Sequence, residues 1–293
     1  MAKTSFYDVE SIRKDFPIFK NNSNLIYFDN ASTTQKPNKV INAISDYYEN
    51  YNANVHRGIY EISERSTESY ENVRDKVVEI INAKDRRSIV FTKGATESIN
   101  LVANSIGKKM IASDEVLITE MEHHSNIIPW QLICRETGAK LRHIPILDDG
   151  LLDKSNIKDL ITEKTKIVCL IHQSNVFGTI NNLNDIIEEA HKKGALVLVD
   201  AAQSVPHDLV DVSILKCDFL VFSGHKMLGP TGVGILYAKP EILEQMDPFL
   251  GGGQMISDVS LNDSTWNDIP WKFEAGTPNI AQVIGLGAAI DYI

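Results

Sequence analysis

The chain has 293 residues, 43% of them hydrophobic, and a formal net charge of −10. This length can bury a large core as one large domain or two ordinary ones, and the negative charge argues against a nucleic acid as the main partner. No apolar run approaches the roughly 18 residues of a membrane-spanning helix, and the N-terminus lacks the pattern of a signal or transit peptide. We therefore expect a cytoplasmic protein that binds neither nucleic acid nor membrane.

The first quarter of the chain is predicted to be mainly helical. Residues 1–24 are expected to form a helical arm that packs on the body of the protein. Its apolar residues recur at helical spacing: Phe6, Val9, Ile12 and Phe16. The next expected elements are a strand at residues 25–28 and helices at residues 37–50 and 63–83.

A polar loop at residues 52–60 separates the two longer helices. It contains His56 and Arg57, and its composition leaves two interpretations open. The loop either faces solvent or reaches into a binding site as a basic finger.

From residue 88 onward, short apolar runs alternate with segments of helical period. The runs IVCLI and LVLV are apolar throughout, as expected when helices cover both faces of a parallel sheet. This alternation predicts an α/β fold with a mostly parallel sheet. Residues 232–237 follow the preceding strand too closely for a crossover helix, so we expect that strand to be antiparallel.

Polar or glycine-containing segments follow the predicted strands. Ligands bind at the carboxyl ends of the strands in sheets of this type, so these segments are expected to share one site. They are Gly94-Ala95-Thr96, Glu122-His123-His124-Ser125-Asn126, His172-Gln173-Ser174-Asn175, Asp200-Ala201-Ala202-Gln203 and Ser223-Gly224-His225-Lys226. The adjacent His123 and His124 are poorly spaced for one metal ion, and we predict no metal site.

Lys226 and Asp200 together indicate pyridoxal phosphate (PLP) as a cofactor. Lysine forms Schiff bases with carbonyl cofactors, and a carboxylate keeps the pyridine nitrogen of PLP protonated. Asp200 ends the strand before that of Lys226, so neighbouring strand ends can hold both residues. The other segments supply further groups: Ala95 at a helix N-terminus and Thr96, Ser223 and His225 for the phosphate, His123 for stacking and proton transfer, and Gln203 for the ring hydroxyl.

These motifs resemble those of the SufS-type (group II) cysteine desulfurases, which are PLP enzymes related to the class V aminotransferases. The resemblance rests on SGHK at residues 223–226, DAAQ at 200–203, EHHSN at 122–126 and NVHR at 54–57. It extends to GGGQMI at 251–256 and FEAGTPN at 273–279, and so runs across nearly the whole chain.

The resemblance implies the PLP-dependent transferase fold type I, with a seven-stranded, mostly parallel sheet flanked by helices. Residues 25–293 would form the PLP-binding large domain, with a protruding hairpin at about residues 254–273. Members of the family continue beyond this point with a small C-terminal domain, which is missing here. That part carries the nucleophilic cysteine and the arginine that binds the substrate carboxylate.

The resemblance also assigns roles to single residues. Lys226 would bind PLP and transfer protons, His123 would act as acid and base, and Asn175 would hold the ring oxygen or the substrate. In a homodimer, Thr277 would contact the phosphate bound to the partner subunit. His56 and Arg57 would lie near the dimeric active site.

The implied reaction converts L-cysteine to L-alanine and passes the sulfur as a persulfide to an acceptor protein of iron–sulfur cluster assembly. The three cysteines here, Cys134, Cys169 and Cys217, are expected to be buried and inert, so we expect the chain to be poorly active. Two alternatives remain open: a selenocysteine lyase, and a non-catalytic, truncated binding module with a PLP-enzyme fold.

Overall fold

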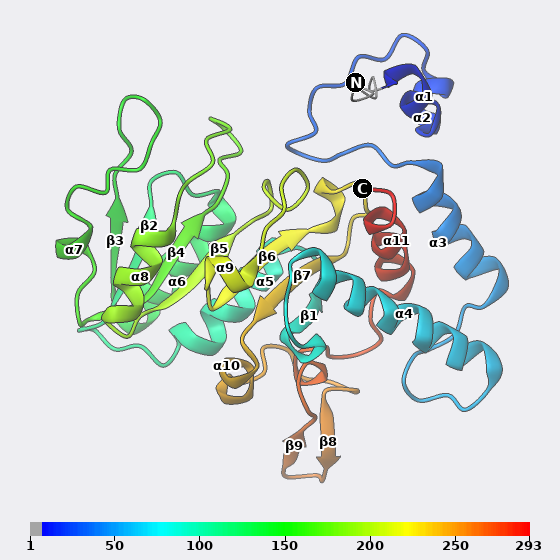
Figure 1. Ribbon diagram of the computed structural model, residues 1–293. Coiled ribbons are helices and arrows are strands. Elements are labelled where there is room, and N and C mark those ends of the chain that lie inside the picture. Colours follow the sequence, from blue (N-terminus) through cyan, green and yellow to red (C-terminus); the bar gives the residue numbers. More distant parts are fainter. Residues whose placement is uncertain (1–7) are drawn as a thin grey trace.

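A seven-stranded β-sheet lies at the centre of the computed structural model, which describes residues 8–293 (Figure 1). Its strands are β1 (Ile89–Thr92), β2 (Glu115–Thr119), β3 (Lys140–Ile144), β4 (Thr165–Ile171), β5 (Leu196–Asp200), β6 (Phe219–Ser223) and β7 (Gly234–Ala238), in the spatial order β1-β7-β6-β5-β4-β2-β3. Strands β2 to β6 pair in parallel, whereas β7 is antiparallel to both β6 and β1. The expected sheet and its antiparallel strand are confirmed.

Helices cover both faces of this sheet. One face packs against α3 (Asn38–Asn50), α4 (Glu61–Ile80), α8 (Asn184–Lys192) and α11 (Ile280–Ile290). The other packs against α5 (Ala95–Val102), which a π-helical turn extends over Ala103–Gly107, and against α6 (Ile128–Thr137) and α10 (Pro240–Gln245). The connections contain two short helices, α7 (Ile157–Leu160) and α9 (Val212–Leu215).

The two-sided burial explains why the strands are apolar without interruption. In β4, Val168 and Leu170 join the core on the α8 side, whereas Ile167 and Cys169 join the core on the α6 side. Successive side chains of a strand point to opposite faces, so a strand covered on both faces needs apolar residues at every position.

Helix α11 packs closely against α3 and α4 (Figure 1). Two of its glycines make this approach possible. A Cβ atom on Gly285 would lie 2.9 Å from Ile44, and one on Gly287 would lie 2.6 Å from Val73. Because both distances are shorter than van der Waals contact, a larger residue at either position would push the helices apart.

The N-terminal segment differs from the prediction in two ways. The arm is two short helices, α1 (Val9–Lys14) and α2 (Pro17–Asn21), because Pro17 cannot continue the first helix. Of the expected helical positions, Phe6 lies outside the described residues. The strand expected at residues 25–28 is wrong: no strand pairs with this segment, and Ile26 and Phe28 are 76% and 92% exposed.

A two-stranded hairpin of β8 (Ile256–Val259) and β9 (Ser264–Trp266) projects from the body at the bottom of Figure 1. It lies within the range predicted for a protruding hairpin. Within residues 8–293, no helix is long and apolar enough to cross a bilayer. Over the same range, the structure brings together no group of three or more His, Cys, Asp and Glu side chains suited to a metal ion.

Candidate active site

A cavity of about 430 Å³ opens at the carboxyl ends of strands β4, β5 and β6. Nine of the residues predicted from the sequence line it together: Ala95, Thr96, His123, Asn175, Asp200, Gln203, Ser223, His225 and Lys226. They come from five separate segments of the chain. The parallel sheet brings these segments together because it places the ends of neighbouring strands at one edge.

Lys226 and Asp200 face this cavity without neutralising each other. Asp200 is 4% exposed, and its Oδ1 accepts a hydrogen bond from the Ala202 backbone N–H at 2.9 Å. Burial raises the pKa of Asp200 and lowers that of Lys226, while the attraction between them opposes both shifts. Among the described residues, neither group belongs to an ion pair within 4.0 Å. Both are therefore available to a bound molecule.

His123 is held in one ring orientation by Ser125. The backbone N–H of Ser125 donates to Nδ1 of His123 at 3.1 Å, so the proton of the neutral ring lies on Nε2. Burial and the charge of Lys226 lower the pKa of His123, which favours the neutral ring. The Oγ of Ser125 also lies 2.7 Å from Oγ1 of Thr96. Ser125 thus links the imidazole to the helix that begins beside it.

Glu122, next to His123, joins three segments below the cavity. Its carboxylate accepts hydrogen bonds from the Thr119 hydroxyl, the Asn126 amide and the Ile171 backbone N–H, each at 2.7 Å. Burial raises the pKa of Glu122 to about 8, with Asp200 as a further cause, although the hydrogen bonds oppose the shift. Glu122 fixes the loop that carries His123 against the end of β4.

The part of the cavity beside the start of α5 is suited to an anion. Helix α5 begins at Ala95, and its first N–H groups carry the positive end of the helix dipole. The Ala95 N–H donates to Oγ of Ser223 at 2.8 Å, so the Ser223 hydroxyl proton is free to turn toward a ligand. His225 and Thr96 line the same end with further donors.

Sequence reasoning missed part of the wall. Asp29, Ala31 and Ser32 line the cavity, and the Ala31 carbonyl accepts a hydrogen bond from Nε2 of Gln203 at 2.8 Å. The run DNASTT at residues 29–34 could have indicated a binding loop, because it is polar, rich in small residues and lies between two apolar segments. Its place beside Gln203 depends on tertiary packing, which no local pattern contains.

Gln173 was given no role from the sequence, although it belongs to the polar segment after β4 that was expected at this site. Its Oε1 is buried beside the cavity and has no hydrogen-bond partner among the described residues. A buried acceptor without a partner costs about 1–3 kcal/mol. Such an atom is expected at a site that is completed by a ligand.

These features fit PLP. A buried carboxylate, a free lysine amine and a neutral imidazole surround one cavity, and a helix N-terminus with hydroxyl donors closes one end. The arrangement supplies a partner for the ring nitrogen, an amine for the aldehyde and donors for the phosphate.

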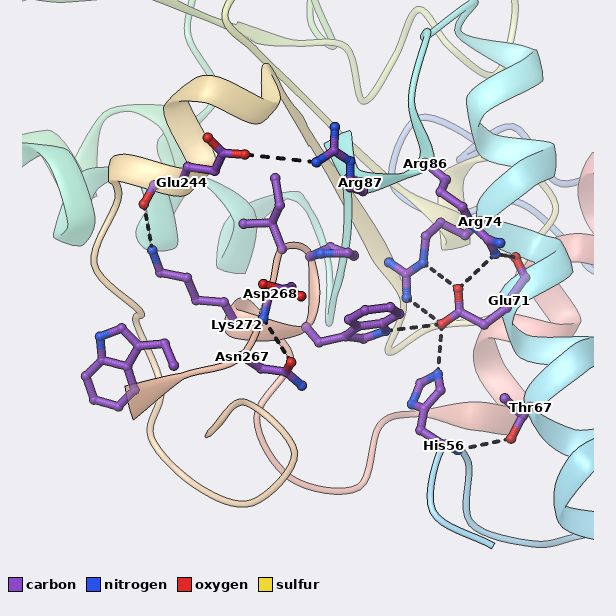
Figure 2. A pocket seen from close by; sticks show the side chains of 14 residues that line it. His56, Thr67, Glu71, Arg74, Arg86, Arg87, Glu244, Asn267, Asp268 and Lys272 are labelled. Carbon is purple, nitrogen blue, oxygen red and sulfur yellow. Dashed lines mark hydrogen bonds and ion pairs between the residues drawn. The ribbon is translucent and has the colours of Figure 1, made fainter. Parts of the chain in front are cut away.

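The remaining predicted residues lie elsewhere in this chain. Arg57 is exposed, and Thr277 lines a smaller cavity with Glu274. His56 lines a larger cavity of about 700 Å³ beside α4 and the hairpin (Figure 2), where its Nε2 lies 2.8 Å from Oε1 of Glu71. A contact of these residues with a partner's site remains a prediction.

The three cysteines lie away from the Lys226 cavity. Cys169 in β4 and Cys217 before β6 are buried as expected, but Cys134 in α6 is only partly buried, so that expectation was wrong for Cys134. Cys134 packs against the core on the α6 side of the sheet but is not fully enclosed by it. Burial raises the pKa of all three thiols, so none is activated as a thiolate.

Comparisons with known proteins identify the family of this chain. Residues 26–293 match the family described as aminotransferase class-V. A probable cysteine desulfurase of Streptomyces coelicolor is 54% identical over 295 residues, an alignment that covers 98% of this chain and 71% of that protein. The chain belongs to the class V aminotransferase family and, within it, to the cysteine desulfurases.

Solved structures of similar proteins share the fold. The crystal structure of a cysteine desulfurase from Escherichia coli superposes with a TM-score of 0.90 at 42% identity, covering 97% of this chain and 71% of that one. A structure of C-DES, with glycine covalently linked to its PLP cofactor, gives a TM-score of 0.83 at 26% identity and covers 96% of this chain and 73% of that one.

Proposed function

We propose that this chain binds PLP through Lys226 and takes L-cysteine as substrate in a desulfuration that yields L-alanine. The observation that carries this proposal is that the buried Asp200 and the half-buried Lys226 line one cavity without forming an ion pair with each other. When bound, PLP supplies an electron sink for bond breaking at the substrate Cα. The membership of the cysteine desulfurases supports L-cysteine as the substrate.

The chain's own residues then divide the work. Asp200 holds the proton on the ring nitrogen, because its carboxylate stays buried at the end of β5. Lys226 moves the proton at the substrate Cα, since burial lowers the pKa of its amine toward the range useful for a base. His123 would stack on the ring of the bound cofactor, and the Ser125 N–H keeps the proton of the neutral imidazole on Nε2.

We further propose that sulfur leaves as a persulfide on a cysteine thiolate and passes to an acceptor of iron–sulfur cluster assembly. A thiolate must reach the substrate sulfur, and Cys134, Cys169 and Cys217 all lie outside the cavity. A polypeptide of these 293 residues is therefore expected to bind PLP but to turn over cysteine slowly. Rapid persulfide formation by that polypeptide would contradict this part of the proposal.

We also propose a homodimer in which Thr277, His56 and Arg57 contribute to the partner's site. The exposure of Thr277 and Arg57 is compatible with this role, and sedimentation at several protein concentrations tests whether the chain forms a dimer.

Selenocysteine lyase activity is a second candidate, because a selenium leaving group lessens the need for a protein thiol. Comparing selenide release from selenocysteine with sulfide release from cysteine distinguishes the two activities.

The cofactor proposal is tested with Lys226→Ala. The unchanged chain is expected to develop the visible absorption band of lysine-linked PLP, and sodium borohydride should then fix the cofactor to the protein. Lys226→Ala should lose both results, because no other amine lines the cavity in the described part of the chain. An unchanged chain that shows no such band would overturn the cofactor proposal and favour a binding module without catalysis.

A further inference from the structure

The carbonyl oxygen of His225, which belongs to the peptide bond leading into Lys226, accepts an unusual number of hydrogen bonds. The donors are the Thr34 N–H at 2.9 Å, the Thr34 hydroxyl at 3.0 Å, the Thr33 hydroxyl at 3.1 Å and the Lys36 amine at 3.0 Å. A carbonyl oxygen has two lone pairs, so these donors saturate it. All of them come from residues 33–36, about 190 positions away in the sequence.

Thr34 also holds the other side of the Lys226 turn. Its Oγ1 accepts a hydrogen bond from the Leu228 N–H at 2.9 Å while its hydroxyl proton points to His225. Leu228 has a φ of 64°, a left-handed conformation that is costly for a leucine. A buried hydroxyl, 8% exposed as a residue, thus links the positions before and after Lys226.

Lys36 completes this arrangement without a carboxylate partner. Its amine contacts the Thr34 carbonyl, the Thr34 hydroxyl and the His225 carbonyl, and within residues 8–293 it forms no ion pair. Burial lowers its pKa to about 8. Ordering a half-buried lysine whose only partners are neutral oxygens costs free energy. This cost is explained if the contacts of Lys36 hold the Lys226 turn in place.

We propose that Thr34 and Lys36 are positioning residues that hold the Lys226 turn in the geometry needed to bind the cofactor. The peptide bond between His225 and Lys226 is planar, so fixing its oxygen fixes the start of the Lys226 side chain. The same segment continues through Ser32, Ala31 and Asp29, which line the cavity. Residues 29–36 therefore shape the site from outside the sheet. This inference rests on the proposed binding of PLP by Lys226.

The test compares Thr34→Val, which removes the hydroxyl at nearly constant volume, with Thr34→Ser, which keeps it. Thr34→Val is expected to slow formation of the lysine-linked PLP band by about tenfold to a hundredfold, because small misplacements of reacting groups have effects of that size. It should also shift the pH midpoint of that band. Lys36→Met should act in the same direction, and Thr34→Ser should stay close to the unchanged chain.

Thr137→Val is the matched control, because the Thr137 hydroxyl donates to a backbone carbonyl in α6 at 2.8 Å, far from the cavity. Wild-type rates and midpoints in Thr34→Val and Lys36→Met would overturn the proposal. So would a Thr34→Ser variant as slow as Thr34→Val, or a Thr137→Val variant with the same defect.

Amide hydrogen exchange of the ligand-free protein separates this inference from the proposed function. Thr34→Val is expected to speed exchange in residues 224–229, because the Leu228 N–H loses its acceptor. Unchanged exchange in this segment would contradict the positioning role of Thr34. If the unchanged chain forms no PLP band, the proposed function fails. In that case exchange still decides whether Thr34 holds the turn.

Discussion

Two cavities of the described structure differ in how their charged side chains are paired. Around Lys226, the buried carboxylate of Asp200 and the half-buried amine of Lys226 form no ion pair, and the buried Oε1 of Gln173 has no hydrogen-bond partner among the described residues. In the larger cavity beside the hairpin, Glu71 is paired with three cationic side chains, those of His56, Arg74 and Arg86 (Figure 2). The comparison shows that cavity size does not mark the chemical site. Polar groups without an ion-pair or hydrogen-bond partner mark the site better, because they remain available to a ligand.

The paired network of the second cavity centres on Arg74. Its guanidinium, 1% exposed, contacts Glu274 at 2.8 Å and Glu71 at 2.9 Å and also donates to the Ile89 carbonyl. Although burial alone would raise it, hydrogen bonds from His56 and Arg74 hold the pKa of Glu71 well below its usual range. These contacts join α4 to the segment before α11 and explain a structural use for His56.

The largest expected effect comes from breaking this network. Arg74→Met leaves the buried Glu274 without its cation, and removing one partner of a buried pair costs about 3–5 kcal/mol. Urea denaturation should show a loss of this size in the free energy of unfolding. The affinity of the folded fraction for PLP should stay unchanged, since Arg74 does not line the Lys226 cavity. A selective loss of PLP affinity would contradict the division between the two regions.

A pH-dependent effect is expected at Glu122, beneath the Lys226 cavity. Its folded-state pKa of about 8 exceeds that of an unfolded glutamate, about 4.3. Between these values the folded chain holds a proton that the unfolded chain has released, so this group's contribution to stability falls as pH rises. This contribution falls by a factor of about ten in the folding equilibrium constant per pH unit, or by roughly 3 kcal/mol between pH 5 and pH 7.

Glu122→Gln should remove that slope. The measurement is the difference in unfolding free energy between the variant and the unchanged chain at several pH values. Glu136→Gln, at an exposed position of α6, is the control. A difference that stays constant from pH 5 to pH 7 would mean that Glu122 is ionised in the folded protein throughout.

Asp200→Asn tests the Lys226 cavity directly. The variant keeps the size of the side chain but loses the charge that would hold the protonated ring nitrogen. A hydrogen bond to a charged group is worth about 1.5–3 kcal/mol, so PLP affinity should fall by about 10- to 100-fold. Equilibrium titration of the lysine-linked band gives the affinity. Stability without the ligand should rise, because a buried carboxylate with a raised pKa is removed.

Much of this site could be predicted because the relevant residues follow their strands directly. The positions of Asp200, Ser223 and Lys226 at the ends of predicted strands were enough to place them in one site. Neighbouring strands of a parallel sheet end at the same edge, so residues at their ends lie close together. The positioning role of Thr34 and Lys36 could not be predicted, because their contacts with His225 join residues about 190 positions apart and no local sequence pattern indicates them. The failed strand at residues 25–28 has the same cause: its apolar pattern was local, but a strand requires a partner.

The smallest expected effect, at Gln173, tests the comparison itself. If the buried Oε1 of Gln173 is unpaired because a ligand completes the site, then Gln173→Leu should stabilise the ligand-free protein by about 1 kcal/mol. The same change should weaken PLP binding, because an apolar side chain cannot replace a polar contact. Gln245→Leu, at an exposed position of α10, provides the control for added apolar surface. A gain in stability with unchanged PLP affinity would make Gln173 a packing defect rather than part of the site. A loss of both would place its oxygen in a hydrogen bond within the protein, and the contrast between the two cavities would then rest on Asp200 and Lys226 alone.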